Sequence, residues 1–290
     1  MNDTLRMDAY EAQVRPIAAK DRALLHELTV SVFWPHRDSD LDLLLQLGEG
    51  YIALDEIGRP LGSAMHFPTG GDFSMLGMMV TPPRLQARGG GRFLLQRLMK
   101  VCEGRDMRLN ATRSGYRLYL SAGFRHAMTV YQHQGHIVRV PEVPAMPGLE
   151  LTVLSPEDHV TVREMDSIAY GLDRRAAIDA LLGVSSGVVA WRAGRPCGFA
   201  LRRRFGKGDL IGPLAADTEE TAVQIVAQLF RQAQGGFFRI DTPGENEALR
   251  GLVTAAGMRQ FDTVTEMHLG ANRRATEGMV HYGLAAHSLG

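Results

Sequence analysis

The chain has 290 residues, enough for two domains of ordinary size, and its 45% hydrophobic and 22% charged residues are typical of a globular protein. Lys and Arg together number 32, as do Asp and Glu, and this zero formal charge argues against a nucleic-acid-binding protein. There are two cysteines without metal-type spacing, no signal peptide and no apolar run of the ~20 residues that a membrane helix needs. We therefore expect a cytoplasmic protein without a disulfide framework, a metal site or a membrane partner.

A proline-rich segment divides the chain almost in half. The stretch VPEVPAMPGLE, from Val140 to Glu150, holds three prolines and a glycine. Proline cannot donate a hydrogen bond to a strand ladder and restricts the residue before it, so this segment is expected to connect two domains. We predict a first domain at 1–140, a linker at 141–148 and a second domain at 149–290.

The first half shows the pattern of a mixed α/β domain. Helical periodicity predicts three helices, at 20–33, 92–102 and 115–123. Apolar runs and alternating patterns predict strands at 12–17, 73–80, 107–112 and 126–134, and a hairpin at 51–67.

The second half repeats this order of elements loosely. Strands are predicted at 149–154, 209–217, 236–242 and 263–269, with a hairpin at 186–204. Helices are predicted at 156–171, 174–182, 219–234 and 245–257. The shared order suggests a duplication in which the second copy has diverged. The hairpin end LRRRFGKGD, at 201–209, is interpreted as a solvated turn, with attraction of an anion as the alternative.

Three consecutive glycines, Gly89 to Gly91, stand directly before the helix predicted at 92–102. The first N–H groups of a helix lack intrahelical partners, and glycines allow close approach of the backbone, so this arrangement suits a phosphate. An ordinary glycine-rich turn is an equally good interpretation of the stretch alone. A dinucleotide fingerprint fails because Leu94 stands at its third glycine position, and the G-K-[ST] ending of a P-loop is missing.

A third phosphate-binding pattern does fit. The stretch VTPPRLQARGGG resembles motif A of the GNAT superfamily of acyl-CoA-dependent N-acyltransferases, in which V-x-P ends a strand and [QR]-x-x-G-x-[GA] leads into a helix. Its positions are taken here by Val80, Pro82, Gln86, Gly89 and Gly91. The stretch LNATRSGYRLYLSAGF resembles motif B of the same superfamily, through Ala111, Leu118, Tyr119, Gly123 and Phe124.

The second half resembles the C-terminal domain of the two-domain, YitH-type branch of this superfamily. The similarity lies in MDSIAYGLDRRAAIDALL, IGPLAAD and HYGLAAHSLG. The sequence departs from that pattern at Glu266, where an arginine is expected, and at Met258, where an aromatic residue is expected. The resemblances imply an α/β (α+β) fold of two tandem GNAT-like domains, each a mixed, mostly antiparallel twisted sheet flanked by helices.

The resemblance implies that acetyl-CoA is the cosubstrate and lies where two central strands diverge. Backbone groups of Met78 and Val80 would pair with the pantetheine arm, and amides of residues 88–92 would bind the pyrophosphate. Asn110 either faces the cofactor or substrate or forms a strand-end hydrogen bond. The residues implied in cofactor binding are Met78, Met79, Val80, Gln86, Ala87, Arg88, Gly89, Gly90, Gly91, Arg92 and Asn110.

Acid and base groups are assigned less directly. Tyr119 matches the tyrosine that protonates the leaving thiolate in this superfamily, and the alternative is a tyrosine that only packs its helix against the sheet. Many relatives have a glutamate on the strand before V-x-P, but the strand at 73–80 holds no carboxylate. The base is therefore left open between a water relay and a remote acid such as Asp72 or Glu49.

Three residues of the second half, Tyr170, Asp173 and Arg174, are candidates for substrate binding. The alternative for Asp173 is an N-cap of the following helix, with Arg174 in its first turn. The expected function is an acetyl-CoA-dependent N-acetyltransferase in which a small primary amine attacks the thioester directly. The alternatives are an acyl-CoA-binding sensor with little turnover and an enzyme that acetylates a protein. The oligomeric state stays open, a homodimer included.

Overall fold

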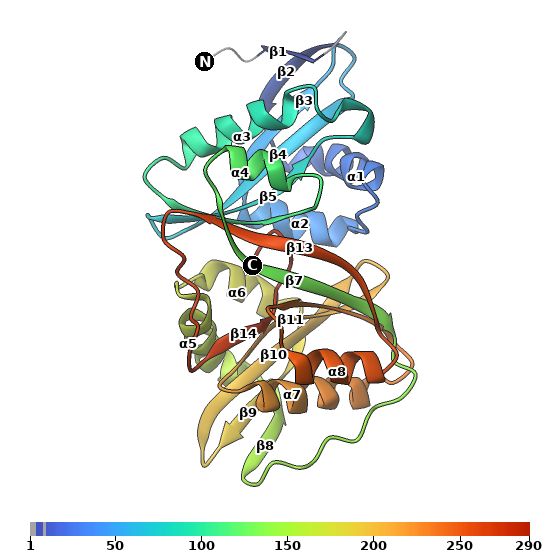
Figure 1. Cartoon of the computed structure of the whole chain (residues 1–290), viewed down its shortest axis with the longest axis vertical. Coiled ribbons are helices and arrows are strands. Elements are labelled where there is room, and N and C mark those ends of the chain that lie inside the picture. The colour runs from blue at the N-terminus through green and yellow to red at the C-terminus, as the bar shows by residue number, and fades with distance from the viewer. Residues whose placement is uncertain (1–3, 8–9) are drawn as a thin grey trace.

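The computed structural model describes residues 4–7 and 10–290 of the chain. Two α/β halves are stacked along the long axis of the molecule, and two long strands cross between them at its waist (Figure 1). Within the described residues, no helix has the length and apolar character needed to cross a membrane.

All elements predicted for the first half are present, and two more were not predicted. The strands are β1 (Thr4–Met7), β2 (Tyr10–Pro16), β3 (Glu49–Leu54), β4 (Pro60–Thr69), β5 (Phe73–Val80), β6 (Asp106–Ala111) and β7 (Arg125–His136). The helices are α1 (Arg22–Ser31), α2 (Asp38–Leu47), α3 (Gly90–Val101) and α4 (Tyr116–Ser121). Strand β1 and helix α2 are the additions. The signal missed for α2 is Asp40, whose carboxylate accepts a hydrogen bond from the Arg37 N–H at 2.9 Å and caps the helix.

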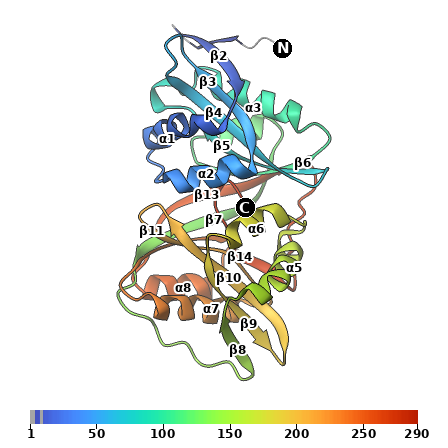
Figure 2. The same ribbon diagram turned by 180° about the vertical axis from the view of Figure 1, so that it is seen from behind.

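The second half also contains its predicted elements. The strands are β8 (Leu149–Val153), β9 (Ser186–Arg192), β10 (Arg195–Phe205), β11 (Gly208–Ala216), β12 (Phe237–Pro243), β13 (Arg259–Leu269) and β14 (Val280–Gly283). The helices are α5 (His159–Tyr170), α6 (Arg175–Leu182), α7 (Glu219–Gln232) and α8 (Glu247–Ala255). In each half, one helix pair covers each face of the sheet. The pairs are α1–α2 and α3–α4 in the first half, and α5–α6 and α7–α8 in the second (Figures 1 and 2).

The two halves share one continuous sheet. The strand order is β1-β2-β3-β4-β5-β6-β13-β7-β12-β11-β10-β9-β8, with β5–β6 and β11–β12 pairing in parallel. Strand β13 therefore lies between β6 and β7 of the first half, and β7 lies between β12 and β13 of the second. The tandem, mixed and mostly antiparallel fold is confirmed, and the exchange of β7 and β13 is a feature that sequence analysis did not foresee.

The C-terminal segment fills a gap in the second half. Strands β11 and β12 pair only over Asp209–Ile211 and Phe238–Ile240 and then separate. Beyond this point β14 pairs with β11, and the next residue, Leu284, donates its N–H to the carbonyl of Asp241 on β12 at 2.9 Å. The opening between the two parallel strands is thus occupied by backbone from the same chain.

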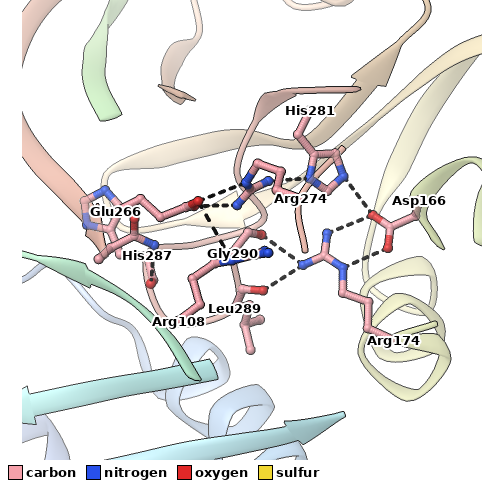
Figure 3. A network of polar contacts seen from close by, with 10 residues as sticks. Arg108, Asp166, Arg174, Glu266, Arg274, His281, His287, Leu289 and Gly290 are labelled. Carbon is pink, nitrogen blue, oxygen red and sulfur yellow. Dashed lines mark hydrogen bonds and ion pairs between the residues drawn. The ribbon is translucent and has the colours of Figure 1, made fainter. Parts of the chain in front are cut away.

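A buried network of charged groups ties this segment to both halves (Figure 3). Arg174 holds the Asp166 carboxylate through two hydrogen bonds of 2.7 and 2.8 Å, and His281 on β14 contacts the same carboxylate at 3.1 Å. The other ring nitrogen of His281 lies 2.9 Å from Arg274. Arg274 in turn binds Glu266 of β13 through contacts of 3.0 and 2.5 Å.

The network reaches the first half through Arg108 on β6. The Arg108 Nε atom lies 3.8 Å from the Glu266 carboxylate, and the guanidinium lies over the Tyr170 ring at 4.7 Å. Burial alone would raise the pKa of Glu266, but Arg274 and Arg108 outweigh it and hold that pKa below its usual range. Glu266, which departs from the family pattern, is thus the shared carboxylate of two buried arginines.

We expect Glu266→Gln to destabilise the protein strongly. The substitution leaves two buried guanidinium groups without their counter-charge, and breaking a buried pair in this way costs about 3–5 kcal/mol. Chemical denaturation measures the loss. Asp42→Asn, which removes the partner of Arg22 in an exposed ion pair, is the control and should change the free energy of unfolding little. Equal effects of the two substitutions would contradict the role given to Glu266.

The protonation of His281 predicts a pH dependence. Burial is the main reason that the pKa of His281 falls from 6.5 to about 4. Between these values the unfolded chain binds a proton that the folded chain does not, so stability should decrease as the pH is lowered through this window. The variant His281→Gln should lose this part of the slope, which a series of denaturation curves between pH 4 and pH 7 would measure. An unchanged slope would mean that His281 is protonated in the folded state.

Candidate functional site

The two central strands of the first half diverge as the resemblance predicts. Strands β5 and β6 pair from Phe73–Asp106 to Leu76–Leu109, and the ladder then ends. On its other side β5 carries a bulge, because Met65 pairs with Gly77 while Ser63 pairs with Val80. Beyond Leu76, the edge of β5 that faces β6 therefore has no strand partner.

The bulge is fixed by local contacts. Met78 has a positive φ of 48°, which is unusual for a residue with a side chain. The Ser63 hydroxyl donates a buried hydrogen bond of 2.8 Å to the Met78 carbonyl and holds this conformation. Backbone groups that would otherwise continue the ladder are thereby presented at a defined place between the strands.

The glycine stretch forms the N-terminus of α3. Gly89 is the N-cap with φ +89°, and its carbonyl accepts the hydrogen bond of the Phe93 N–H at 3.0 Å. The N–H groups of the first turn, from Gly90 onward, have no intrahelical acceptor and lie at the positive end of the helix dipole. Gln86 fixes the preceding loop by donating to the Thr81 carbonyl at 3.1 Å.

A cavity of about 520 Å³ opens at this helix terminus. Two arginines, Arg92 and Arg117, give it positive charge, as an anionic ligand requires. Of the residues predicted to bind the cofactor, Met79, Gln86, Ala87, Gly89, Gly91 and Arg92 line it. Met78 and Asn110 line a neighbouring cavity, and Val80, Arg88 and Gly90 line neither.

The neighbouring cavity, about 340 Å³ in volume, lies between the two halves. The first half contributes the loop at 32–36, α2, β5 and β6, and the second half contributes β10, β12, β13 and the segment at 286–288. Met79, Thr112 and Tyr119 line both cavities, so the two are adjacent at the point where β5 and β6 diverge.

Tyr119 is positioned by helix α4. Its side chain is buried, and its ring packs edge-on against Phe124 at 6.1 Å. Burial raises the pKa of the Tyr119 hydroxyl well above its usual value, so this group keeps its proton at any ordinary pH.

Three buried polar atoms of the cavity between the halves have no hydrogen-bond partner within the described residues: His36 Nδ1, Asn110 Oδ1 and Arg203 Nε. Burial, followed by the charges of Arg239 and Arg203, lowers the pKa of His36 to about 3, so this ring is neutral. Because buried polar groups in native proteins are nearly always paired, these atoms indicate a cavity suited to a polar ligand.

A second charged cluster borders the same cavity, which Arg239 and His287 line. Arg239 binds the buried Asp241 carboxylate through hydrogen bonds of 2.7 to 3.2 Å. His287 Nε2 lies 3.2 Å from that carboxylate and 3.2 Å from Arg239 Nη2. Burial alone would raise the pKa of Asp241, but Arg239 and His287 hold it below its usual range.

The substrate candidates of the second half lie elsewhere. Tyr170 and Arg174 belong to the buried network, with the Arg174 guanidinium 3.9 Å from the Tyr170 ring. Asp173 is exposed and accepts a hydrogen bond from the Arg175 N–H, and Arg174 itself is the N-cap of α6. None of the three lines either cavity.

The carboxylates considered as remote bases are also distant. Asp72 pairs with Arg273 at 2.7 Å, Glu49 is exposed, and neither lines a cavity. Sequence analysis missed His36, Arg203, Arg239 and His287. The arginine run in LRRRFGKGD was a partial signal for one of them. Arg203 of this hairpin is buried and lines the cavity, whereas the next residue, Arg204, is exposed.

The second half offers no equivalent cofactor groove in the described structure. Strand β14 occupies the gap between β11 and β12, and helix α7 begins with Glu219 and Glu220 after the N-cap Thr218. Two carboxylates at a helix N-terminus would repel a phosphate, whereas the first turn of α3 in the first half contains no acidic residue. In the parts of the chain that the structure describes, no three His, Cys, Asp or Glu side chains are grouped to hold a metal ion.

Comparisons with known proteins agree with this geometry. The family model of the acetyltransferase (GNAT) domain matches residues 162–283. The YitH protein of Bacillus subtilis (strain 168), described as an uncharacterized N-acetyltransferase, is 27% identical over 237 residues, which cover 79% of this chain and 81% of that protein.

Solved structures share the fold over most or all of the chain. A putative acetyltransferase from Pyrococcus horikoshii superposes with a TM-score of 0.78 at 21% identity, covering 100% of this chain and 99% of the other. A tandem GNAT protein from the clavulanic acid biosynthesis pathway superposes with a TM-score of 0.64 at 14% identity, covering 90% of this chain and 100% of the other.

We expect Gly89→Asp to abolish binding of coenzyme A. Gly89 needs the left-handed conformation, and the added carboxylate would face the anion at the helix terminus. Titration calorimetry with coenzyme A measures the effect. Gly58→Asp is the matched control, because Gly58 has φ +83° in a hairpin turn with the same open surroundings. Normal binding by the Gly89 variant would show that the glycine turn does not hold the cofactor.

Proposed function

We propose that this chain, like the GNAT acetyltransferases that it resembles, transfers the acetyl group of acetyl-CoA to the primary amine of a small molecule. The observation that carries the proposal is the divergence of β5 and β6 between two adjoining cavities, one at a helix N-terminus and one lined by polar groups. The first cavity suits the cosubstrate, and the second suits the acceptor.

The cosubstrate is assigned to the first cavity by its backbone donors. The backbone at the start of α3, where Gly89, Gly91 and Arg92 line the cavity, binds the pyrophosphate, with Arg92 and Arg117 adding charge. The open edge of β5 at Met78–Val80 pairs with the pantetheine arm, which brings the thioester to the shared wall at Met79, Thr112 and Tyr119.

The acceptor is assigned to the cavity between the halves. Its walls come from both halves, and it is enclosed by the segment at 286–288. A site of about 340 Å³ favours a small molecule over the side chain of a folded protein. The unpartnered atoms of His36, Asn110 and Arg203 supply polar contacts for it.

The reaction needs no enzyme nucleophile. The amine nitrogen attacks the thioester carbonyl, a C–N bond forms, and the C–S bond breaks as the tetrahedral intermediate collapses. A backbone N–H of the bulge stabilises the oxyanion, since such donors act strongly where charge develops in a site that excludes water. Tyr119 gives its proton to the sulfur, and the amine loses protons as the amide forms.

The acetyl-transfer proposal is tested with a panel of amino acids, polyamines and aminoglycosides. Release of free thiol from acetyl-CoA in the presence of one of these amines, together with the acetylated product in mass spectra, is the expected result. Tight binding of coenzyme A without turnover across the panel would favour an acyl-CoA sensor instead.

We expect Tyr119→Phe to leave the dissociation constant of acetyl-CoA unchanged and to lower kcat about 10²-fold, the usual contribution of a positioned acid. Steady-state kinetics with an active amine measure this. Tyr116→Phe is the control, because Tyr116 lies on the same helix but lines neither cavity. If both variants kept wild-type kcat, Tyr119 would be a packing residue.

A further inference from the structure

We propose that Phe33 and Phe261 bind an aromatic ring of the acceptor, so that the preferred substrate is a small amine that carries an aryl group. This inference rests on the proposed acetyl transfer and names the class of amine. Three observations on the two residues carry it. Both line the cavity between the halves, both are exposed, and both occupy irregular backbone positions.

Both phenylalanines expose much of their apolar surface beside the cavity. The exposed fraction is 91% for Phe33 and 66% for Phe261, although each residue lines the cavity between the halves. Phe33 comes from the first half and Phe261 from the second. Large apolar side chains left exposed at a cavity with polar groups around it indicate a ligand-binding site, because a ligand covers them.

Phe33 occupies a backbone position that normally belongs to glycine. Helix α1 ends in a Schellman motif, in which the Phe33 N–H bonds to the Val30 carbonyl at 3.0 Å. The Trp34 N–H bonds to the Thr29 carbonyl at 2.9 Å and completes the motif. The motif requires a left-handed residue after the helix, and Phe33 supplies it with φ 60°. A bulky residue is strained there, and its exposed ring gains little packing that would offset the strain.

Phe261 is the extra residue of a β-bulge in β13. Gln260 pairs with His133 of β7. Asp262 pairs with the adjacent Gln132, so Phe261 has no partner on β7. Successive side chains of a regular strand point to opposite faces of a sheet, yet both Phe261 and Asp262 line the cavity. The bulge therefore brings the phenylalanine to the cavity in addition to the aspartate.

Two other aromatic rings of the cavity are engaged within the protein. Trp34 and Phe205 each pack against His36, with ring centroids 6.0 and 5.5 Å apart. Phe33 and Phe261 differ, because neither makes a ring contact or a cation contact with any residue that the structure describes. Their rings are left to contact a ligand, and offset or edge-on packing on another aromatic ring is the contact they favour.

The charges of the cavity disfavour a polycation. The charged residues that line it are Arg203, Arg239 and Lys207 on one side of the balance, with Asp40 and Asp262 as the carboxylates. Lys207 is exposed and forms no ion pair within the described residues. A polyamine or an aminoglycoside would bring several positive charges to a lining without a negative excess, whereas an aryl amine brings one.

The amine itself is assigned to the end of β6. Asn110 Oδ1 is buried there without a partner in the described chain, and it can accept a hydrogen bond from the amine N–H. This atom belongs to the strand that diverges from β5, next to the place assigned to the thioester. The acceptor would thus contact Asn110 through its nitrogen and the two phenylalanines through its ring.

The test uses pairs of amines that differ only by a phenyl ring: 2-phenylethylamine against ethylamine, and 4-phenylbutylamine against butylamine. We expect wild type to show a kcat/KM at least 10-fold higher for an aryl amine than for its partner, and to use spermidine poorly. In Phe33→Gly and in Phe261→Ala, KM for the aryl amine should rise about 10-fold at unchanged kcat, because the lost contact binds ground state and transition state alike. The kcat/KM of the alkylamine should stay unchanged.

Phe33→Gly has a second readout, its stability. Glycine adopts the left-handed conformation without strain, so the melting temperature of this variant should rise even though its KM for the aryl amine also rises. Ala193→Gly is the matched control. Ala193 has φ 50° in the turn between β9 and β10 and lines neither cavity, so its variant should gain stability with no change in KM.

The outcomes separate this inference from acetyl transfer. Variants of Phe33 and Phe261 with wild-type KM for aryl amines would overturn the inference and leave acetyl transfer intact. A wild type that acetylates no amine would overturn acetyl transfer. Calorimetry with N-acetyl-2-phenylethylamine in the presence of coenzyme A would then decide, since binding that both variants weaken supports the aryl site and no binding by wild type overturns it.

The two exposed rings could instead meet a second copy of the chain. Sedimentation of wild type and of both variants tests this, and the same oligomeric state is expected for all three. Variants that change the oligomeric state while keeping the wild-type KM for aryl amines would assign Phe33 and Phe261 to a contact between copies and overturn the inference.

Discussion

The antiparallel pairing of β13 with β7 is the constraint on which the rest of the molecule depends. The ladder runs from Arg259–Gln134 to His268–Arg125, with two irregularities in its register. Each of these strands is the last long strand of its own half. Each is also inserted into the sheet of the other half, with β13 between β6 and β7 and with β7 between β12 and β13. Neither half completes its sheet alone, so their relative position is fixed by backbone hydrogen bonds as well as by side-chain packing. A cavity lined by residues of both halves can therefore hold its geometry.

The two halves differ at corresponding places in their sheets. Both retain a parallel strand pair that separates partway along its length. In the first half the gap stays open next to a glycine-rich helix terminus, and in the second half β14 closes it next to a helix that begins with two glutamates. The segment after β14 then extends to β5 and β6, where Ser288 packs against Gly77 and Asn110 binds the His287 carbonyl. The gap is thus closed in the second half, and the C-terminal segment lines the cavity between the halves that we propose for the acceptor.

Much of this architecture was readable from local sequence, and the remainder depends on contacts between distant residues. Periodicity and the motifs around Gly89 and Tyr119 predicted the strand, turn and helix order because those signals lie within a few residues of each other. The pairing of Glu266 with Arg108 spans more than half of the chain, so the sequence could show Glu266 only as a departure from a pattern. His287 gave no signal, since its contacts with Arg239 and Asp241 are made with another strand, β12.

The buried network of charged groups constrains the geometry of the fold more than it stabilises it. Ion pairs of this kind contribute little net stability relative to apolar packing. They do require an accurate geometry, because a misplaced partner leaves a buried charge uncompensated. Here Asp166 of α5, Arg274, His281 of β14 and Glu266 of β13 must all be in register for each charge to be paired. The same register sets where the chain leaves β14, and hence where His287 meets the diverging strands. Correct charge pairing in the interior and correct placement of the segment that lines the cavity between the halves are therefore consequences of one arrangement.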